Sequence, residues 1–590
     1  MSTTDGLSVF TVMLAHCLAL QVVKDVTGAA PRSVAGTCAT GALAVTIVSA
    51  HARPGSDGAL VALAVAGMFA LGVNGSQSNH VLLELAIAGA VLVSAPWGAL
   101  MNDLLGGRGK GGEGGGVDRG RNGKRRRDAF SRRVTRAMRA ALAVLYAMTG
   151  FAKLNDAWHD PSTSCCVQMY VGALTAWGVP ATHATLFHPA ALRAMPYAAT
   201  AFELGFPVAL LASTPGSLGA RGLAMAGGLF HVFIALPPPP MSVYPFSMIM
   251  APMYVAALVP AEAGAAARGL AASPLRVRAG IGAVLATLTA HAWQLNRASS
   301  YFEYPPYFAW EVGVLWVALA FGFVAAVAVL GVTSEGTSSS ASSESTTEPG
   351  KKARGGAARD DAKPGGEWSE AVRSSYAPLL PALFVFLVSA STYFGVRTYP
   401  SFAMFSNLLL EGGASNHWVV RSPLSLVAAH AVDTPAAASA TADRARHYGP
   451  DVAIEVLDTD LPALRHLQVN LAPLLPPRVL GALDATNVTA EFHITPPAWP
   501  YPPTETTFRP FSAPLTEIRR RVSTAEQGDF FVAYRWVLRG EREERVREYR
   551  RVGGTTVAGA EEVLGAPLPR ARAVLHRFRT FDLDRSPCRH

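Results

Sequence analysis

The sequence has little charge, few cysteines and no familiar catalytic motif. Charged residues make up 16% of its 590 positions, against about 25% in an ordinary soluble domain. The shortage of charge and the clustering of apolar residues exclude a single soluble globule, and they also exclude a disordered or fibrous protein. The five cysteines show no paired CxxC spacing and are too few for a disulfide framework. We therefore expect no metal site.

The net charge of +9 does not indicate a nucleic-acid partner. Much of the basic excess lies beside apolar runs, where Lys and Arg set membrane topology through the positive-inside rule. The first apolar run, at 7–23, has no basic segment before it and no small-residue cleavage site. We interpret it as a membrane segment, with the lipid bilayer as partner.

Long apolar runs fill most of the first 395 residues. A spanning helix needs about 20 mostly apolar residues. Candidate spans lie at 7–23, 35–51, 59–74, 80–101, 134–152, 195–213, 218–236, 245–260, 276–294, 309–332 and 376–395. The pattern predicts a polytopic all-α membrane protein with about 9–11 transmembrane helices, followed by a C-terminal extracytoplasmic β-rich domain.

Two low-complexity linkers divide the chain. Both carry Lys and Arg near helix ends, so we expect both to be flexible, solvated and cytoplasmic. The predicted parts are N-terminal helices 1–104, a basic Gly-rich linker 105–133, a membrane core 134–332, a second linker 333–375, a last span 376–395 and the tail 396–590.

The tail has the composition of a soluble β-rich domain on the side opposite the linkers. Residues 530–537 are rich in β-branched and aromatic residues and predict a strand. Gly540 then predicts a turn toward a second strand at 545–549, and 461–476 predicts a helix. Asn487 begins an Asn-Val-Thr sequon, which predicts glycosylation on the lumenal or exterior side.

Lys153 is the first candidate for chemistry. It follows the apolar run ALAVLYAMTGFAK and precedes Leu154 to Trp158. Burial in a medium of low dielectric favours the uncharged amine, which can act as a base. In the alternative interpretation, Lys153 snorkels at a helix end and Trp158 lies in an interfacial aromatic belt.

Further candidates lie in or beside other apolar runs. His231, in LAMAGGLFHVFIAL, is either functional or hydrogen-bonded between helices. Asn79 and His80 open the run HVLLELAIAGAVLV. There they either cap the helix and lie at the interface, or stabilise an oxyanion at the helix N-terminus. Glu203 is a carboxylate that pairs with Lys153 or with His231, and the sequence does not choose between them.

Four short stretches carry a resemblance to a known family. They are Ser78 to His80, Phe151 to Trp158, His231 with Pro245 to Met248, and Tyr399 to Ser406 with Ser415 to His417. In order and spacing these stretches resemble the vitamin K-dependent gamma-carboxylase family and the wider HTTM (horizontally transferred transmembrane) group. The resemblance covers roughly residues 70–420.

The resemblance implies an activity. In that family a neutral lysine deprotonates reduced vitamin K, and O2 then converts the quinol into a strong base. This base removes the gamma proton of a peptide glutamate, which adds CO2. By position, Lys153 would match the initiating base, Asn79 and His80 the carboxylation step, and His231 the quinone step. The implied residues around reduced vitamin K or another quinol are Glu203, Phe246, Met248 and Trp158.

Two other functions remain open from the sequence. One is a non-enzymatic HTTM protein that binds lipid or a protein partner through its tail. The other is a transporter, although we find no paired half-helices or inverted repeat. The resemblance and the sequon favour the endoplasmic reticulum or secretory pathway, with a plastid or plasma membrane as alternatives.

Overall fold

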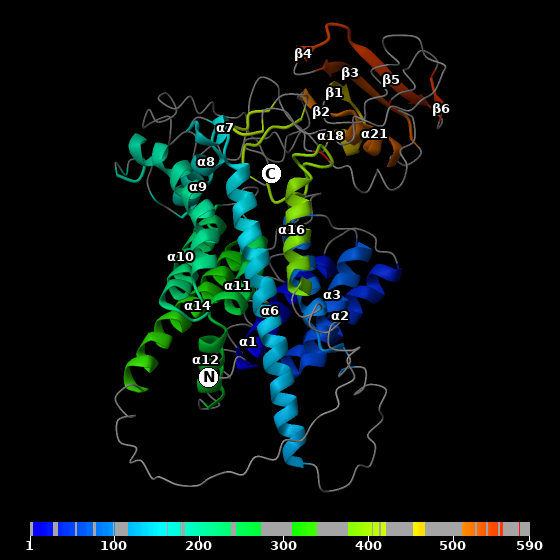
Figure 1. Ribbon diagram of the computed structural model, residues 1–590. Helices are drawn as coiled ribbons and strands as arrows, with labels where there is room; N and C mark the ends of the chain where they lie inside the picture. The colour runs from blue at the N-terminus through cyan, green and yellow to red at the C-terminus, as the bar shows by residue number, and fades with distance from the viewer. Residues whose placement is uncertain are drawn as a thin grey trace, which may run out of the picture.

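The chain is mostly helical and carries a small antiparallel sheet toward its C-terminus (Figure 1). The computed structural model describes residues 4–27, 34–53, 56–74, 78–97, 100, 116–161, 163–177, 179, 183, 185–237, 243–272, 310–338, 376–403, 405–411, 415–420, 452–465, 510–524, 528–538, 541–552, 555–557, 564 and 578.

The apolar runs form a bundle of helices, because a helix satisfies its backbone hydrogen bonds within one segment. The helices are α1 Thr4–Thr27, α2 Val34–Ala52, α3 Asp57–Asn74, α4 Asn79–Ser94, α6 Gly116–Ala152, α7 Asp156–His159, α8 Cys165–Ala176, α9 Pro189–Ala212, α10 Leu218–Ala235, α11 Tyr244–Leu258, α12 Pro260–Ala272, α14 Trp310–Ser338, the short 3₁₀ helix η1 Ala377–Leu379, and α16 Leu380–Ala390. The long helix α6 runs the length of the bundle and projects beyond it at its N-terminal end (Figure 1).

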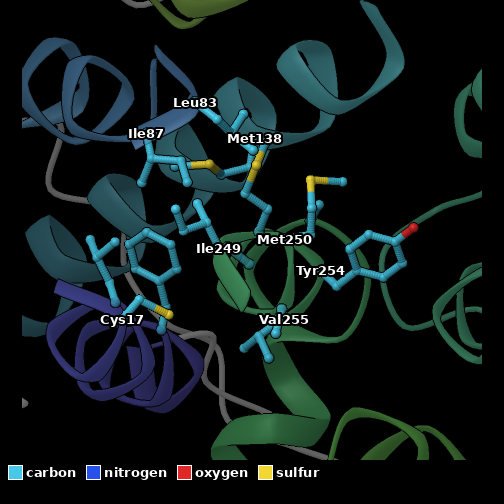
Figure 2. Packing of buried hydrophobic residues seen from close by; sticks show 14 of the residues in the cluster. Cys17, Leu83, Ile87, Met138, Ile249, Met250, Tyr254 and Val255 are labelled. Atoms are coloured by element: carbon cyan, nitrogen blue, oxygen red, sulfur yellow. The ribbon is translucent and has the colours of Figure 1, made fainter. Parts of the chain in front are cut away.

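Helix α11 lies at the centre of the bundle. Every residue from Ser247 to Leu258 is buried, as expected for a helix that is apolar all round. Figure 2 shows Ile249 of α11 pointing toward Ile87 of α4 and Met138 of α6, and these three side chains belong to one core.

Two glycines allow neighbouring helices to approach closely. A Cβ on Gly227 of α10 would lie 2.1 Å from the hydroxyl of Tyr254 on α11. A Cβ on Gly150 of α6 would lie 2.9 Å from the side chain of Leu204 on α9. The second contact holds the C-terminal part of α6 close to the middle of α9, where the candidate site lies.

Within the described residues, two helices are long and apolar enough to cross a membrane, namely α9 and α10. A third span results if α11 and the start of α12 count as one, although they are bent by 103°. The apolar stretches of the other helices, such as Leu7–Ala19 in α1 and Gly313–Val329 in α14, have 10–17 residues. The structure thus supports a helical chain with two or three apolar spans. The expected span at 276–294 lies outside the described residues.

The prediction of a flexible linker at 105–133 is wrong for its second half. Residues 116–133 belong to α6, so the expected boundary at 134 falls inside a continuous helix. Arg and Lys are good helix formers, and here they extend a helix whose apolar part is already packed in the bundle. Likewise, residues 333–338 end α14. Residues 101–115 and 339–375 lie outside the described part of the chain.

The tail contains a six-stranded sheet in the order β2-β1-β3-β5-β6, with β4 also paired to β3. All its pairings are antiparallel. The strands are β1 Val452–Thr459, β2 Phe511–Pro514, β3 Phe530–Leu538, β4 Glu541–Arg542, β5 Arg547–Val552 and β6 Thr555–Thr556, with helices α18 Pro462–Arg465 and α21 Leu515–Thr524.

The two predicted strands of the tail are confirmed as β3 and β5, which pair with each other. Buried Tyr534 and Trp536 of β3 share a core with Ile518 of α21. The helix predicted at 461–476 is described only as α18, and the rest of that range lies outside the described residues. Asn487 lies outside them too.

Candidate functional site: a paired lysine in an apolar cavity

A cavity of about 290 Å³ lies at the end of the bundle nearest the sheet. It is enclosed by α8, α9 and α10, by the C-terminal end of α6, by α7, by the starts of α4 and α11, and by Phe402 and Phe405. Its lining is mostly Phe, Met and Ala, with a few polar side chains, as in sites for apolar small molecules. Five of the eight predicted site residues line it: Lys153, Glu203, Asn79, Trp158 and Phe246.

Lys153 and Glu203 form a buried ion pair inside this cavity. The distance from Lys153 Nζ to Glu203 Oε2 is 2.6 Å, and the two side chains are 9% and 7% exposed. Nζ also lies 3.4 Å from the carbonyl oxygen of Thr149 and 5.1 Å from the centre of the Trp158 ring. Glu203 therefore pairs with Lys153, which answers the choice that the sequence left open.

The pair changes the chemistry expected of Lys153. Burial by itself would favour a neutral amine, whereas the structure also gives this amine a carboxylate partner at hydrogen-bond distance. The carboxylic acid–amine form and the carboxylate–ammonium form of such a pair have the same net charge. A proton can therefore move between Nζ and Oε2 without leaving an isolated buried charge.

Asn79 contributes an unsatisfied hydrogen-bond donor to the cavity. Its Oδ1 accepts a hydrogen bond from the backbone N–H of Phe402 at 2.9 Å. Its Nδ2 is buried and has no hydrogen-bond partner among the described residues. An unpaired buried donor costs about 1–3 kcal/mol, so an acceptor oxygen on a ligand would stabilise this site. The residue at the N-cap of α4 is Ser78, so Asn79 is not the cap.

Trp158 forms a fixed wall of the cavity. Asn155 Oδ1 accepts a hydrogen bond from the backbone N–H of Trp158 and caps α7. The indole Nε1 donates to Thr200 Oγ1 at 2.9 Å and to the carbonyl of Pro196 at 3.1 Å. Trp158 is 3% exposed. Its side chain is therefore part of the interior, and the interfacial-belt interpretation does not hold for it.

His231 lies behind the cavity wall, in a buried chain of hydrogen bonds. Its Nε2 lies 2.8 Å from the hydroxyl of Tyr146, which lies 2.5 Å from the hydroxyl of Tyr254. Its Nδ1 lies 3.3 Å from Ser247 Oγ. The ring of Phe246, which lines the cavity, is next to the imidazole, with a centroid distance of 6.2 Å. The sequence alternative of a histidine hydrogen-bonded between helices describes this arrangement.

His80 and Met248 also do not line the cavity. His80 is half-buried, and its ring lies within 3.1 Å of Ser78 Oγ. Met248 lies two residues beyond Phe246, so its side chain points away from the cavity-facing side of α11. It packs in the bundle core, and its carbonyl accepts a hydrogen bond from Cys17 Sγ at 3.3 Å.

Sequence reasoning missed several residues at or near the site. Phe402 and Phe405 line the cavity with φ angles of 54° each, a left-handed conformation that is rare for bulky residues. Hydrogen bonds hold this segment: Asn155 Nδ2 donates to the carbonyl of Ser406, and Asn407 Oδ1 accepts from the backbone N–H of Cys165. The only signal in the sequence was the resemblance of Tyr399 to Ser406.

Within the described part of the chain, no group of three or more His, Cys, Asp or Glu side chains is arranged to hold a metal ion. Comparison with known proteins finds no matching family model, no matching curated protein and no matching solved structure.

Proposed function

We propose that the chain is a polytopic membrane enzyme of the vitamin K-dependent gamma-carboxylase type, with Lys153 as the base that acts on a quinol. One observation carries the proposal. The hydrogen-bonded Lys153–Glu203 pair and the amide nitrogen of Asn79, which has no hydrogen-bond partner among the described residues, line the same apolar cavity. An apolar body with a polar oxygen, such as a quinol, fits such a lining.

When bound, reduced vitamin K or a related quinol supplies an acidic hydroxyl and, with O2, the basicity needed to carboxylate a glutamate with CO2. The protein supplies position and proton transfer. Asn79 Nδ2 donates a hydrogen bond to a ligand oxygen, which gives the orphaned donor a partner. The apolar lining excludes water that would compete for the proton.

Lys153 and Glu203 manage the proton as a unit. While Glu203 holds the shared proton on Oε2, Nζ has a free electron pair and accepts a proton from the ligand hydroxyl. The ammonium that forms then lies beside the face of the Trp158 ring, where a cation–π interaction stabilises it. His231, through its contact with Phe246, shapes the cavity from behind. His80 serves the carboxylation step in this proposal.

The exposed surfaces of helices other than α9 and α10 support the proposal that the whole bundle is embedded in lipid. Large apolar side chains are exposed on several helices at once, which soluble proteins avoid because water disfavours such patches. They include Val48 of α2 at 68%, Phe69 of α3 at 57%, Val329 of α14 at 50% and Leu387 of α16 at 56%. A bilayer would cover these surfaces.

Cys165 supports a location in the secretory pathway. It is disulfide-bonded, whereas Cys17, Cys38 and Cys166 are free. Disulfides persist in oxidising compartments and are rare in the cytosol. Cys165 begins α8, next to the cavity, so this end of the bundle would face the lumen together with the tail.

The test is quinol epoxidation by the full chain in detergent, comparing wild type with Lys153→Ala. We expect Lys153→Ala to lower turnover at least about 100-fold, the usual contribution of a positioned base. Lys124→Ala is the matched control, because Lys124 is an exposed lysine on α6, the helix that ends just before Lys153. Equal turnover in wild type and Lys153→Ala would overturn the assignment.

A second measurement on the same samples separates the two half-reactions. Incorporation of labelled CO2 into a glutamate peptide is expected in wild type and in Lys124→Ala. Epoxidation without any incorporation would reduce the function to quinol oxidation and remove the carboxylase part of the proposal.

A further inference from the structure

The N-terminal part of α6 carries a cluster of exposed cations before and beside the point where the helix enters the bundle core. Lys124, Arg125, Arg126 and Arg132 are exposed, and we call them the basic end of α6. From Phe130 onward α6 is packed in the bundle core: Phe130, Val134 and Met138 are at most 1% exposed. Arg132 lies on the side of the helix opposite these residues, whereas Lys124 to Arg126 precede the first buried residue and point in several directions around the helix.

Hydrogen bonds and an ion pair fix the position of residues 127–133 along the long axis of the bundle. Arg127 Nε lies 3.6 Å from Oδ1 of Asp57, the first residue of α3, and its Nη2 donates to Ser8 Oγ near the start of α1. Arg133 Nε donates to the carbonyl of Ser94, the last residue of α4. Three other helices therefore begin or end at the level of residues 127–133.

Trp97, at the end of α4, is an aromatic residue of the kind found at membrane interfaces, and it lies near the same position along the bundle axis. Trp97 follows the end of α4, is 45% exposed, and donates its Nε1–H to the carbonyl of Leu92. Tryptophan is enriched where the hydrocarbon core meets the lipid headgroups. The basic end of α6 thus lies at the interface opposite the cavity, because α6 ends beside the cavity at Lys153.

The geometry places the four cations at headgroup depth. A helix rises about 1.5 Å per residue, so Lys124 to Arg126 lie within about 5 Å of Arg127 along the axis. The headgroup zone is about 5–8 Å thick on each side of the hydrocarbon core. Arg132 lies on the bundle side of Arg127, and its long side chain can extend back to the same zone.

We propose that the basic end of α6 binds the headgroups of anionic phospholipids in the leaflet opposite the cavity. Near an anionic membrane each Lys or Arg strengthens association about fivefold. A lipid surface is favoured over RNA or an acidic protein, because exposed apolar residues lie on helices that pack against α6, such as Leu211 on α9 and Leu387 on α16. The proposal requires a lipid-embedded bundle but does not depend on the enzymatic activity.

The experiment measures lipid selectivity of the full chain in phosphatidylcholine vesicles that contain about one-fifth phosphatidylserine. Electron paramagnetic resonance of spin-labelled lipids gives the relative association of the two lipids with the protein. At about 0.1 M salt we expect phosphatidylserine to be favoured at least about twofold. At about 1 M salt, where charges are screened beyond about 3 Å, the preference should disappear.

The variant replaces the basic end: Lys124→Gln, Arg125→Gln, Arg126→Gln and Arg132→Gln together. We expect it to lose the preference, whereas a control with Arg545→Gln, Arg550→Gln and Arg551→Gln in the tail keeps it. Circular dichroism checks that each variant folds. If the fourfold variant does not fold, the pair Arg125→Gln and Arg126→Gln should lose about half of the preference on a logarithmic scale.

Three outcomes would overturn the proposal. One is an unchanged preference in the folded fourfold variant or the folded pair. Another is a preference that persists at high salt. The third is binding of an RNA oligomer that depends on these four residues while phosphatidylserine shows no preference. None of these readouts uses turnover, so failure here is distinct from failure of the proposed enzyme.

Discussion

Lys153 and Glu203 are ionisable side chains enclosed by an apolar lining, and each is the other's partner across a 2.6 Å contact between Nζ and Oε2. Removing one partner of a buried pair leaves an uncompensated charge or forces a change of protonation. The two side chains are therefore stable in this cavity only as a pair. In the function that we propose, Glu203 holds the proton that Lys153 must release before it acts as a base.

His417 shows a second buried group whose protonation is tied to the fold. Its Nε2 donates to the carbonyl of Phe151, and its Nδ1 accepts from the backbone N–H groups of Val419 and Val420. Burial lowers the pKa of His417, and the hydrogen bond to Phe151 partly opposes this effect. A proton on Nδ1 would break both backbone hydrogen bonds, so the folded state keeps the ring neutral.

The pH dependence of stability follows from this lowered pKa. In the unfolded chain His417 has a pKa of about 6.5, so below that pH the unfolded state binds a proton that the folded state rejects. Stability therefore falls as pH drops below about 6.5. We expect the thermal midpoint to decrease from pH 7 to pH 5, and less steeply in His417→Gln than in wild type. The exposed His183→Gln should keep the wild-type slope, and equal slopes in all three proteins would contradict the assignment.

At the scale of elements, helix α10 packs closely against α11 because Gly227 has no side chain that would collide with Tyr254. The hydroxyl of Tyr254 occupies the space that a Cβ would need, and that hydroxyl belongs to the chain reaching His231 through Tyr146. Packing of these two helices and the hydrogen bonds of His231 are therefore coupled.

A pair of substitutions in α10 tests this coupling. Gly227→Ala should destabilise the protein by about 1–3 kcal/mol, because the new methyl group overpacks the contact with Tyr254. Gly222→Ala is the matched control, since a Cβ there meets no atom within 4 Å. It should be neutral or stabilising by up to about 1 kcal/mol through helix propensity. Thermal unfolding in detergent measures both, and an equal effect of the two would refute the close contact.

At the scale of the molecule, the sheet and the C-terminal end of α6 lie at one end and the N-terminal end of α6 lies at the other (Figure 1). The cavity borders the C-terminal end of α6 through Thr149. Leu409, in the segment that follows α16, packs against Ala453 and Val537 of the sheet. The tail is thus in contact with the segment that also supplies Phe402 and Phe405 to the cavity.

The placement of the sheet and the N-terminal end of α6 at opposite ends of the molecule predicts a topology in the membrane. In sealed vesicles with the cytoplasmic face outward, added protease should cut within 101–115 and 339–375 and spare the sheet. A glycosidase should shift the mobility of wild type but not of Asn487→Gln. Cleavage of the sheet before the two linkers would reverse the orientation, and with it the side on which the cavity opens.

Much of the local structure follows from neighbouring residues. The described apolar runs are helices, and the segments at 530–537 and 545–549 fall in or overlap paired strands β3 and β5, because residue periodicity and turn residues such as Gly540 are local properties of the chain. The helical continuation of α6 through 116–133 was missed, since its Gly and Arg composition suggested a solvated linker. Tertiary packing of the adjoining apolar half outweighs that composition.

The sequence by itself determined which polar groups lie in apolar surroundings, because an ionisable residue stands out within an apolar run. Only the tertiary structure decided which of them meet. Lys153 and Glu203 are 50 residues apart, and Asn79 and Phe402 are 323 apart. Contacts over such separations depend on how helices pack, on Gly150 and Gly227 as spacers, and on the segment 402–405 closing the cavity. No local pattern of residues encodes those distances.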